Sequence, residues 1–396
     1  MTSPDREVSA TITDDGIARL RLRIGIPVQL PPPFNSEAHP DTMRHYARGF
    51  GDDNPLYGEA GYGQRSCWGT VIGAPFYVST LGRSDAGPMP ADIRAQTRGA
   101  LAGVGEFYGG SRWLLQEPVR PGDTVRALQR LIDVQEQPSR SYGGRLVRTR
   151  TQVDYTRERD DAPLATHVFT FFKVERSARP GTDDRGTARA GAPVYPADEI
   201  DQIEADILAE RRRGSEPRYI EDVRTGETLG QLTKGPLRIS DVIAWRIGNG
   251  PGTRQWGAFR LLSQVREKQP GFFTRNANGA WDLVQRLHWE DAWAQRIGQP
   301  RAYDEGAMRE AWMAQLATDW MGDAGWLCEI DAEIRKFNYM GDLTRVTGEV
   351  TEVQPASGLA LATVAGVNQR GEQTCRARVT MRLPSRAGGV PTVEAG

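Results

Sequence analysis

The stretch "PVRPGDTVRALQRLIDVQ" at residues 118–135 has a near copy in "FNYMGDLTRVTGEVTEVQ" at residues 337–354. Both contain Gly-Asp, an arginine three residues after the aspartate, and an ending made of an acidic residue, Val and Gln. In each copy a turn precedes a strand-like alternation of apolar and polar residues. Two copies so far apart in one chain indicate an internal repeat, which divides the protein into similar halves.

The segments around these copies repeat as well. Each half opens with a helix signal, at residues 40–52 and at residues 239–251. Each half closes with two more strand patterns, "LVRTRTQVDYT" and "THVFTFFKVER" in the first, "LALATVAGV" and "RARVTMRLPSR" in the second. The first helix signal places one apolar face on a helical period, formed by Met43, Tyr46, Ala47 and Phe50. We therefore predict an α+β fold in which each half is a helix, a loop, a second helix and a run of antiparallel strands, with the sheet packed on a central helix.

A connector separates the halves. Residues 177–199 are rich in Gly, Pro, Ala and charge and poor in large apolar residues, as in linkers. Residues 197–213 follow with apolar residues at roughly helical spacing and a basic end. The predicted division is an N-terminal half at 1–178, a linker with a bridging helix at 179–216, and a C-terminal half at 217–390.

Composition excludes several classes of protein. The chain has 396 residues and a formal net charge of −1, with 50 Lys and Arg against 51 Asp and Glu. This balance argues against nucleic-acid binding, which needs a basic surplus or stripe. No apolar run approaches the roughly 18 residues of a membrane span, and the N-terminus lacks the apolar region of a signal peptide. We expect a cytoplasmic protein that binds neither nucleic acid nor membrane.

Cysteine and histidine usage gives no metal site. The three cysteines are far apart and odd in number, which makes a disulfide framework improbable and a reducing compartment the default. The four histidines share no metal-ligand spacing, and the sequence has neither CxxC nor HExxH. We expect no metal. The histidines are His39, His45, His167 and His288.

The order of short motifs resembles one family. "GDDNP" at 51–55, a second helix expected near "VIGAP" at 71–75, and a strand after "PGD" at 121–123 resemble the hotdog-fold MaoC-like acyl dehydratases and (R)-specific enoyl-CoA hydratases. The first half is similar to their FAS1-like dehydratase N-terminal domain, and the second to a diverged MaoC domain. The resemblance implies a tandem, or double, hotdog that adds water to, or removes it from, an acyl thioester. It implies no cofactor other than CoA as part of the substrate, CoA rather than acyl carrier protein as the carrier, and a homodimer as the expected assembly.

The family's working motif is Gly-Asp-x-Asn-Pro-x-His, followed about 18 residues later by His-Gly at the start of the central helix. The chemistry explains both parts. Hydration of a 2-enoyl thioester needs an acid and a base, which a histidine and a carboxylate can supply around one water. The thioester oxygen gains enolate charge, which a backbone N–H at a helix N-terminus stabilises.

In the first half the motif is incomplete. Asp52 and Asn54 fit it, but Tyr57 stands in place of the histidine, and a phenol with a pKa near 10 is a poor base at neutral pH. Pro75 stands where the family has its oxyanion glycine, and proline has no N–H. The resemblance therefore implies that this half binds substrate, through Asp52, Asn54 and Tyr57, and does not catalyse. An Asx turn is the alternative role of Asp52.

In the second half the same offset of 231 residues maps Tyr57 to His288 and Pro75 to Gly306. This places a catalytic histidine at His288 and an oxyanion donor at Gly306. The alternatives are an ordinary surface histidine and a glycine required for close helix–sheet approach. The family's aspartate is missing, because its place falls on Leu283 or Pro251, on either side of an insertion at 252–281. Asp282 is the preferred carboxylate partner of His288; Glu290, Asp291, Asp304 and, across the interface, Asp52 are others.

Three further features complete the expected site. Tyr303 is expected to bind substrate. Arg309 either meets a CoA phosphate or pairs with Glu305, four residues before it. Trp281, Trp289 and Trp293 either line an acyl tunnel or pack in the core.

The expected function is that of a hydro-lyase acting on 2-enoyl-CoA or 3-hydroxyacyl-CoA. One alternative is a binding or partner subunit whose catalytic pair has decayed, because both halves have lost part of the motif. Another is an altered reaction on an unusual biosynthetic acyl thioester.

Overall fold

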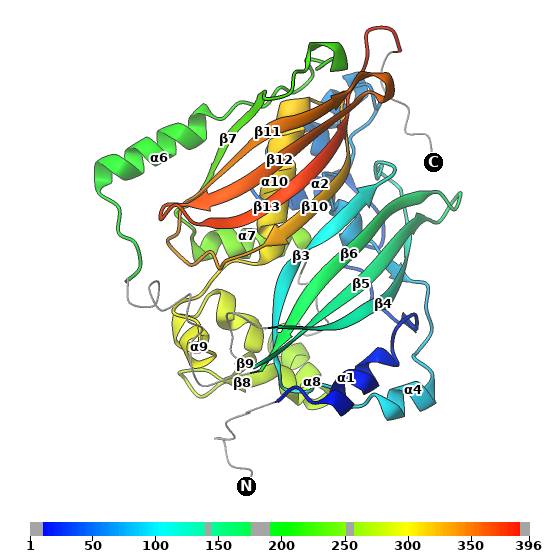
Figure 1. Cartoon of the computed structure of the whole chain (residues 1–396), viewed down its shortest axis with the longest axis vertical. Helices are drawn as coiled ribbons and strands as arrows, with labels where there is room; N and C mark the ends of the chain where they lie inside the picture. The colour runs from blue at the N-terminus through cyan, green and yellow to red at the C-terminus, as the bar shows by residue number, and fades with distance from the viewer. Residues whose placement is uncertain (1–10, 139–143, 176–190, 251–256, 389–396) are drawn as a thin grey trace.

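One large sheet organises the molecule (Figure 1). The computed structural model describes residues 11–138, 144–175, 191–250 and 257–388. Within them, eleven strands form a sheet in the order β1-β4-β5-β6-β3-β10-β13-β12-β11-β7, with β2 beside β4. Every neighbouring pair is antiparallel except β2 and β4. The strands are β1 (Pro27–Val28), β2 (Arg83–Ser84), β3 (Gly105–Leu115), β4 (Val125–Pro138), β5 (Arg145–Arg157), β6 (Pro163–Val174), β7 (Thr228–Lys234), β10 (Trp326–Ile334), β11 (Thr344–Gln354), β12 (Leu359–Asn368) and β13 (Gln373–Arg382).

The two halves of the chain meet at the pair β3–β10. Gly110 to Leu114 of β3 lie opposite Glu333 to Glu329 of β10. Gly110 has a φ of +117°, and a Cβ there would lie 2.1 Å from the carbonyl oxygen of Ala332. Only glycine fits this close approach, so the join between the halves depends on it.

The sequence repeat is confirmed at the level of turns and bulges. Gly122 and Gly341, which precede β4 and β11, have φ of +86° and +88°. Each is followed by a fully buried aspartate whose carboxylate accepts a hydrogen bond from the backbone N–H three residues earlier, Arg120 in one case and Tyr339 in the other. Both strands also carry a register shift at matching places, after Leu131 and after Val350.

The opening helix of each half is also confirmed. The two helices are α2 (Pro40–Gly49) and α7 (Ile239–Asn249), and they pack on each other. A Cβ on Gly49 would lie 3.0 Å from the Ala244 oxygen, and one on Gly248 would lie 2.5 Å from the His45 oxygen. Glycine on both helices therefore permits their close crossing.

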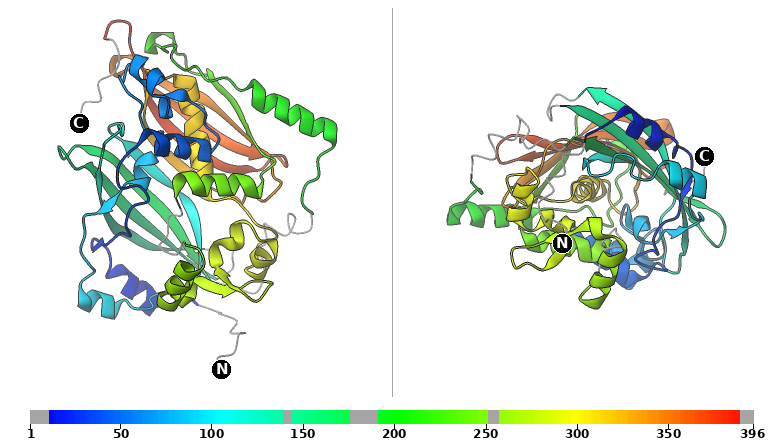
Figure 2. Two further views of the ribbon diagram at one scale, coloured as in Figure 1. Left: turned by 180° about the vertical axis from the view of Figure 1, so that it is seen from behind. Right: turned by 90° about the horizontal axis from the view of Figure 1, so that it is seen from below.

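The central helix exists in one half only. α10 (Gly306–Met321) is buried along almost its whole length and contacts strands of both halves, including β3. The view from below in Figure 2 looks nearly along it, with strands around it. In the first half, the predicted second helix near "VIGAP" is wrong: only the short 3₁₀ helix η2 (Tyr77–Thr80) follows Pro75. The residue before a proline avoids the α region, and Phe76 takes a φ of +70°, so an α-helix cannot start here.

The connector is described in part. Residues 176–190 of the predicted linker lie outside the described residues. The predicted bridging helix is α6 (Ala197–Ala209), which lies beside β7 and buries Ile203, whereas Leu208 is 80% exposed. Among the described residues, no helix combines the length and apolar character needed to cross a membrane. The remaining elements are α1 (Asp14–Arg21), α3 (Ala60–Arg65), α4 (Ala91–Gln96), α8 (Arg260–Lys268), α9 (Asp291–Arg296), the hairpin of β8 (Phe273–Arg275) and β9 (Trp281–Leu283), and the 3₁₀ helices η1 (Pro55–Tyr57), η4 (Ile220–Asp222), η5 (Pro270–Phe272), η6 (Val284–His288) and η7 (Pro355–Ser357).

Candidate active site

His288 and Gly306 occupy the positions that the repeat offset predicts. His288 is the last residue of η6, just as its counterpart Tyr57 is the last residue of η1. Gly306 is the first residue of α10. The backbone oxygen of Tyr303 accepts a hydrogen bond from His288 only three residues before the helix begins. The histidine therefore lies close to the N-terminal end of the central helix.

The surroundings of His288 determine its tautomer and charge. Its Nδ1 lies 2.9 Å from the Tyr303 oxygen. A carbonyl can only accept, so Nδ1 carries the hydrogen and Nε2 keeps the lone pair. Burial lowers the pKa of His288 below its ordinary 6.5; the charge of Glu305 raises it and that of Arg246 lowers it. His288 is thus a neutral imidazole at neutral pH with Nε2 able to accept a proton.

Glu305 is the carboxylate whose charge acts on His288. It is the N-cap residue of α10, and its Oε1 accepts from Nη2 of Arg246. The guanidinium of Arg246 lies 5.3 Å from the ring centre of Trp289. Sequence reasoning considered Glu305 only as a partner of Arg309. A residue directly before the predicted oxyanion glycine was the signal that could have identified it.

Asp282, the preferred partner of His288, has local hydrogen bonds. Its Oδ1 accepts from the Leu283 N–H at 2.7 Å, and its Oδ2 lies 3.4 Å from Nδ2 of Asn276. Within the part of the chain that the structure describes, neither oxygen bonds to His288. The other carboxylates considered also bond elsewhere: Glu290 pairs with Arg286, Asp291 accepts from the Ala302 N–H, and Asp304 pairs with Arg309.

Gly306 combines close packing with a free donor position. A Cβ there would lie 2.7 Å from Cδ1 of Tyr108, so the ring of Tyr108 requires glycine at this point. Gly306 is also the first helical residue, where a backbone N–H has no partner within the helix. Aromatic rings surround this end: Tyr303 contacts the rings of His288 and Phe337, with centroids 5.1 and 4.7 Å away. Tyr303 therefore lies where the sequence predicts it, beside His288.

One turn further along α10, Glu310 is buried between the two halves. It is 2% exposed and accepts hydrogen bonds from Tyr108 Oη at 2.9 and 3.0 Å and from Ser111 Oγ at 2.9 Å. Burial raises its pKa from 4.5 to about 7, against the opposing effect of these hydroxyl donors. Sequence reasoning missed this group, because its partners lie about 200 residues away on β3.

We expect the variant Glu310→Gln to lose part of the protein's pH dependence of stability. The folded state holds the Glu310 proton more tightly than the unfolded chain, so the wild type loses stability as pH rises from about 4.5 to 7. This loss is on the order of 3 kcal/mol and is complete above pH 7. The variant should therefore gain most, relative to wild type, at pH 8. Denaturant unfolding at pH 5 and pH 8 measures it, with the exposed Glu349→Gln as control; equal pH slopes in wild type and Glu310→Gln would contradict it.

The first-half loop forms a separate buried cluster. Asp52 is 2% exposed, and its Oδ1 accepts from the Asn54 N–H at 2.9 Å, which is the Asx turn considered above. Burial raises the pKa of Asp52 to about 6, opposed by the Asn54 N–H and the charge of Lys234. Asn54 donates to Asp323 at 2.9 Å. Next to Asn54 and Tyr57 the cavity is only about 20 Å³, enough for one water and too small for an acyl group.

This cluster lies toward the far end of α10 from His288. Gln315 Nε2 lies 3.4 Å from the Gly51 oxygen, and Gln315 is nine residues beyond Gly306. At 1.5 Å per residue, about 13 Å of helix separates the two places. The predicted reach of Asp52 to His288 across the interface is therefore not formed. The role of Asp52, Asn54 and Tyr57 in substrate binding stays a prediction.

Arg309 has neither of the expected partners. It is 2% exposed, and its Nε lies 3.0 Å from Oδ2 of Asp304. Its Nη1 donates to the backbone oxygens of Lys336 and Thr374. Both the CoA phosphate contact and the pair with Glu305 are therefore wrong, because Arg309 turns into the core and stabilises the buried Asp304.

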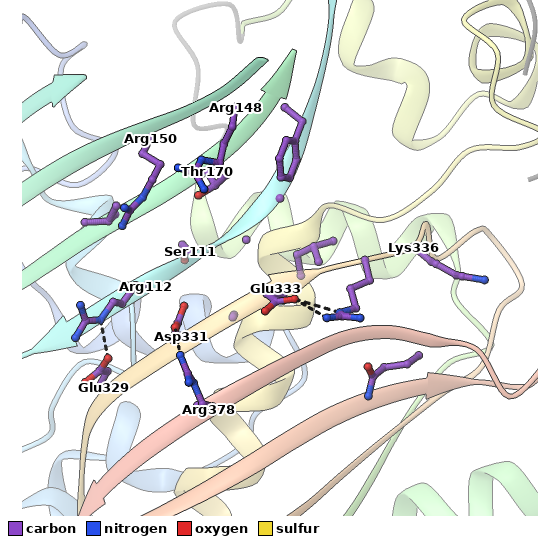
Figure 3. Close-up of a pocket in the computed structure, with 18 of the residues that line it drawn as sticks. Ser111, Arg112, Arg148, Arg150, Thr170, Glu329, Asp331, Glu333, Lys336 and Arg378 are labelled. Carbon is purple, nitrogen blue, oxygen red and sulfur yellow. Dashed lines mark hydrogen bonds and ion pairs between the residues drawn. The ribbon is translucent and has the colours of Figure 1, made fainter. Parts of the chain in front are cut away.

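The largest hollow lies on the other side of the sheet (Figure 3). It measures about 1040 Å³ and crosses the β3–β10 join, where charged side chains alternate with those that face α10. These charges pair across strands, as in Arg112–Glu329 and Asp331–Arg378. Neither His288 nor Gly306 lines it, so this groove is a solvated face and not the candidate active site.

Comparisons with known proteins give one family match and likenesses of fold. Residues 33–166 match the family model "FAS1-like, dehydratase domain region". A solved MaoC-like dehydratase has a TM-score of 0.61 and 14% identity, over 92% of this chain and 99% of its own. A MaoC domain dehydratase from Chloroflexus aurantiacus J-10-fl has a TM-score of 0.53 and 10% identity, over 96% and 100%. No curated protein matches the chain.

Proposed function

The chain carries a FAS1-like dehydratase region and has the MaoC-like fold, which places it among the hotdog dehydratases, and from this premise we propose that it is a hydro-lyase acting on an acyl thioester. The proposed reaction adds water to a 2-enoyl thioester or removes it from a 3-hydroxyacyl thioester. One observation carries the proposal: the Nδ1–H of His288 is bound by a backbone carbonyl, which leaves a neutral Nε2 beside the N-terminus of α10.

His288 is the proposed base. In the hydration direction, Nε2 takes a proton from water as the water oxygen bonds to Cβ of the enoyl group. The resulting imidazolium would be stabilised by the charge of Glu305, which favours the protonated form. The proton is then available for delivery to Cα. A base positioned in this way typically contributes 10²–10⁴-fold to a rate.

The N-terminus of α10 is the proposed oxyanion site. Charge develops on the thioester oxygen when the nucleophile adds to Cβ, and the Gly306 N–H and the positive end of the helix would stabilise it. The pairing of Glu305 with Arg246 reduces the negative charge that Glu305 would otherwise place there. In the first half, Pro75 supplies no equivalent donor, so we propose a double hotdog with one catalytic half, at 217–390, and one non-catalytic half, at 1–178.

Substrate turnover tests the proposal directly. We expect the purified chain to change the absorbance of the enoyl-thioester band of crotonyl-CoA, or of a longer 2-enoyl-CoA, when it is added at micromolar concentration. Absence of turnover across a panel of straight-chain, branched and aromatic 2-enoyl-CoA substrates would reject the hydro-lyase proposal.

The pH dependence of kcat/KM gives a sharper test. Because His288 must be neutral to act as base, and burial lowers its pKa below 6.5, we expect the acid limb of the profile to lie below pH 6.5. Between pH 6.5 and 8 the rate should change little through this group. Measurement of kcat/KM from pH 5 to 8 checks the expectation, and an acid limb centred above pH 7 would exclude His288 as the base.

A second candidate is a subunit whose catalytic pair has decayed. The observation that favours it is the absence, among the described residues, of any carboxylate hydrogen-bonded to His288. This candidate predicts that the pure chain binds an acyl thioester without turning it over, and that activity appears only with a partner chain. Turnover by the chain alone separates the two.

A further inference from the structure

The insertion before His288 presents an exposed tryptophan. Residues 257–283 contain α8 and the β8–β9 hairpin, which lie together in Figure 1. Trp281 is the first residue of β9 and is 42% exposed. Arg275 lies directly opposite it in the hairpin register. An indole so exposed does not pack in the core, so neither expectation for Trp281, tunnel lining or core packing, accounts for it.

Two guanidiniums cover this indole. The Cζ atoms of Arg266, from α8, and Arg275, from β8, lie 5.0 and 4.6 Å from the ring centre of Trp281. The two cations are therefore within roughly 10 Å of each other, a distance at which like charges still repel at ordinary ionic strength. The indole offsets part of this repulsion, because its face attracts cations.

No carboxylate neutralises the pair within the described ranges. The guanidinium of Arg275 donates to the backbone oxygen of Gly279, and that of Arg266 has only its contact with Trp281. Asp282 is next to Trp281, but adjacent strand residues point to opposite faces, and its carboxylate is bound to Leu283 and Asn276. The site thus has two uncompensated cations and an exposed aromatic face.

The position of this cluster relates it to the candidate active site. β9 leads directly into η6, whose last residue is His288, seven residues after Trp281. A 3₁₀ helix rises about 2 Å per residue, so the two residues are roughly 15–20 Å apart or closer. A pantetheine arm has a comparable reach. The cluster therefore lies where the far end of a CoA thioester would fall if its acyl carbon were at His288.

We propose that Trp281, Arg266 and Arg275 bind the nucleotide end of a CoA thioester, an inference that rests on the proposed function. The exposed part of the indole would stack on the adenine, as aromatic side chains do with bases. The guanidiniums would hold phosphate oxygens with their paired N–H groups, which suit phosphate better than lysine does. The carrier is then CoA and not an acyl carrier protein, whose phosphopantetheine has no adenine.

Calorimetric titration with adenosine 3′,5′-bisphosphate tests the site without any turnover. We expect the full chain to bind this probe and the double variant Arg266→Ala/Arg275→Ala to bind it at least tenfold more weakly. Arg260→Ala removes one exposed charge from the same helix and should leave affinity unchanged. Trp281→Phe should retain most of the affinity, whereas Trp281→Ala should lose it.

Kinetics with two thioesters separates the site from the reaction. The double variant should raise KM for crotonyl-CoA and leave kcat/KM unchanged for the crotonyl thioester of N-acetylcysteamine, which has no nucleotide. If the wild type does not bind the bisphosphate, or the double variant binds it equally well, the inference is overturned whatever the activity. If affinity depends on these arginines but no 2-enoyl thioester is turned over, the nucleotide site stands and the proposed reaction fails.

Discussion

Replacement of His288 by alanine lowers kcat/KM for a 2-enoyl-CoA substrate by about 10³-fold in the result that we expect, because the only positioned base beside the α10 N-terminus is removed. His288→Asn should lower it as far. The asparagine amide can still donate to the Tyr303 oxygen, as Nδ1 does, but has no lone pair in place of Nε2. The decrease would therefore follow loss of the base and not loss of the local structure.

A matched control uses another histidine of the chain. His45 is exposed on α2, and His45→Ala should keep the wild-type rate. Thermal unfolding of all three variants shows whether the fold is intact. If His288→Asn retained more than a tenth of wild-type activity with an unchanged melting temperature, His288 would not be the base, and the carboxylates near α10 would be the next candidates.

Replacement of Arg309 by methionine should destabilise the protein by about 3–5 kcal/mol. Both members of the Arg309–Asp304 pair are buried, so the variant leaves a carboxylate without its cation. Burial has already raised the pKa of Asp304 to about 6, against the opposing charge of Arg309. In the variant Asp304 can escape the cost by taking up a proton, so the destabilisation should be larger at pH 8 than at pH 5. Denaturant unfolding at the two pH values measures it.

The double variant Asp304→Asn/Arg309→Met separates the charge effect from packing. Asparagine keeps an acceptor for Asn338, which donates to Asp304 Oδ2 at 3.1 Å, but carries no charge. We expect the double variant to be more stable than Arg309→Met alone. Arg335→Met, which breaks an exposed pair with Glu333, should cost at most about 1 kcal/mol. A loss as large for Arg335 as for Arg309 would show that burial does not govern the effect.

Much of the fold could be predicted from local patterns. The turn before β4 and β11 needs a glycine with positive φ and an aspartate that bonds its own backbone, and both requirements are visible in "PGD" and "MGD". α2 shows its buried face through helical spacing alone. These features depend on residues a few positions apart, so the sequence contains nearly all of the information.

The strands that join the halves were not predicted individually. β3 contains Gly109 and Gly110 in its middle, which weakens a strand pattern, and here the glycines permit the close approach to β10. The absence of a central helix in the first half has a local cause in Pro75 and Phe76, but the positive φ of Phe76 is a property of the folded chain.

By itself, the sequence determined the two halves, the helix pair α2 and α7, and the positions of His288 and Gly306 through a repeat offset that no insertion interrupts. Tertiary structure alone decided which charged groups surround them: Glu305 near His288, Asp304 with Arg309, and Arg266 and Arg275 on Trp281. The physical reason is range. Turns and helix faces are set by neighbours in the chain, whereas the partner of a buried charge depends on which distant segments pack against it once water is excluded.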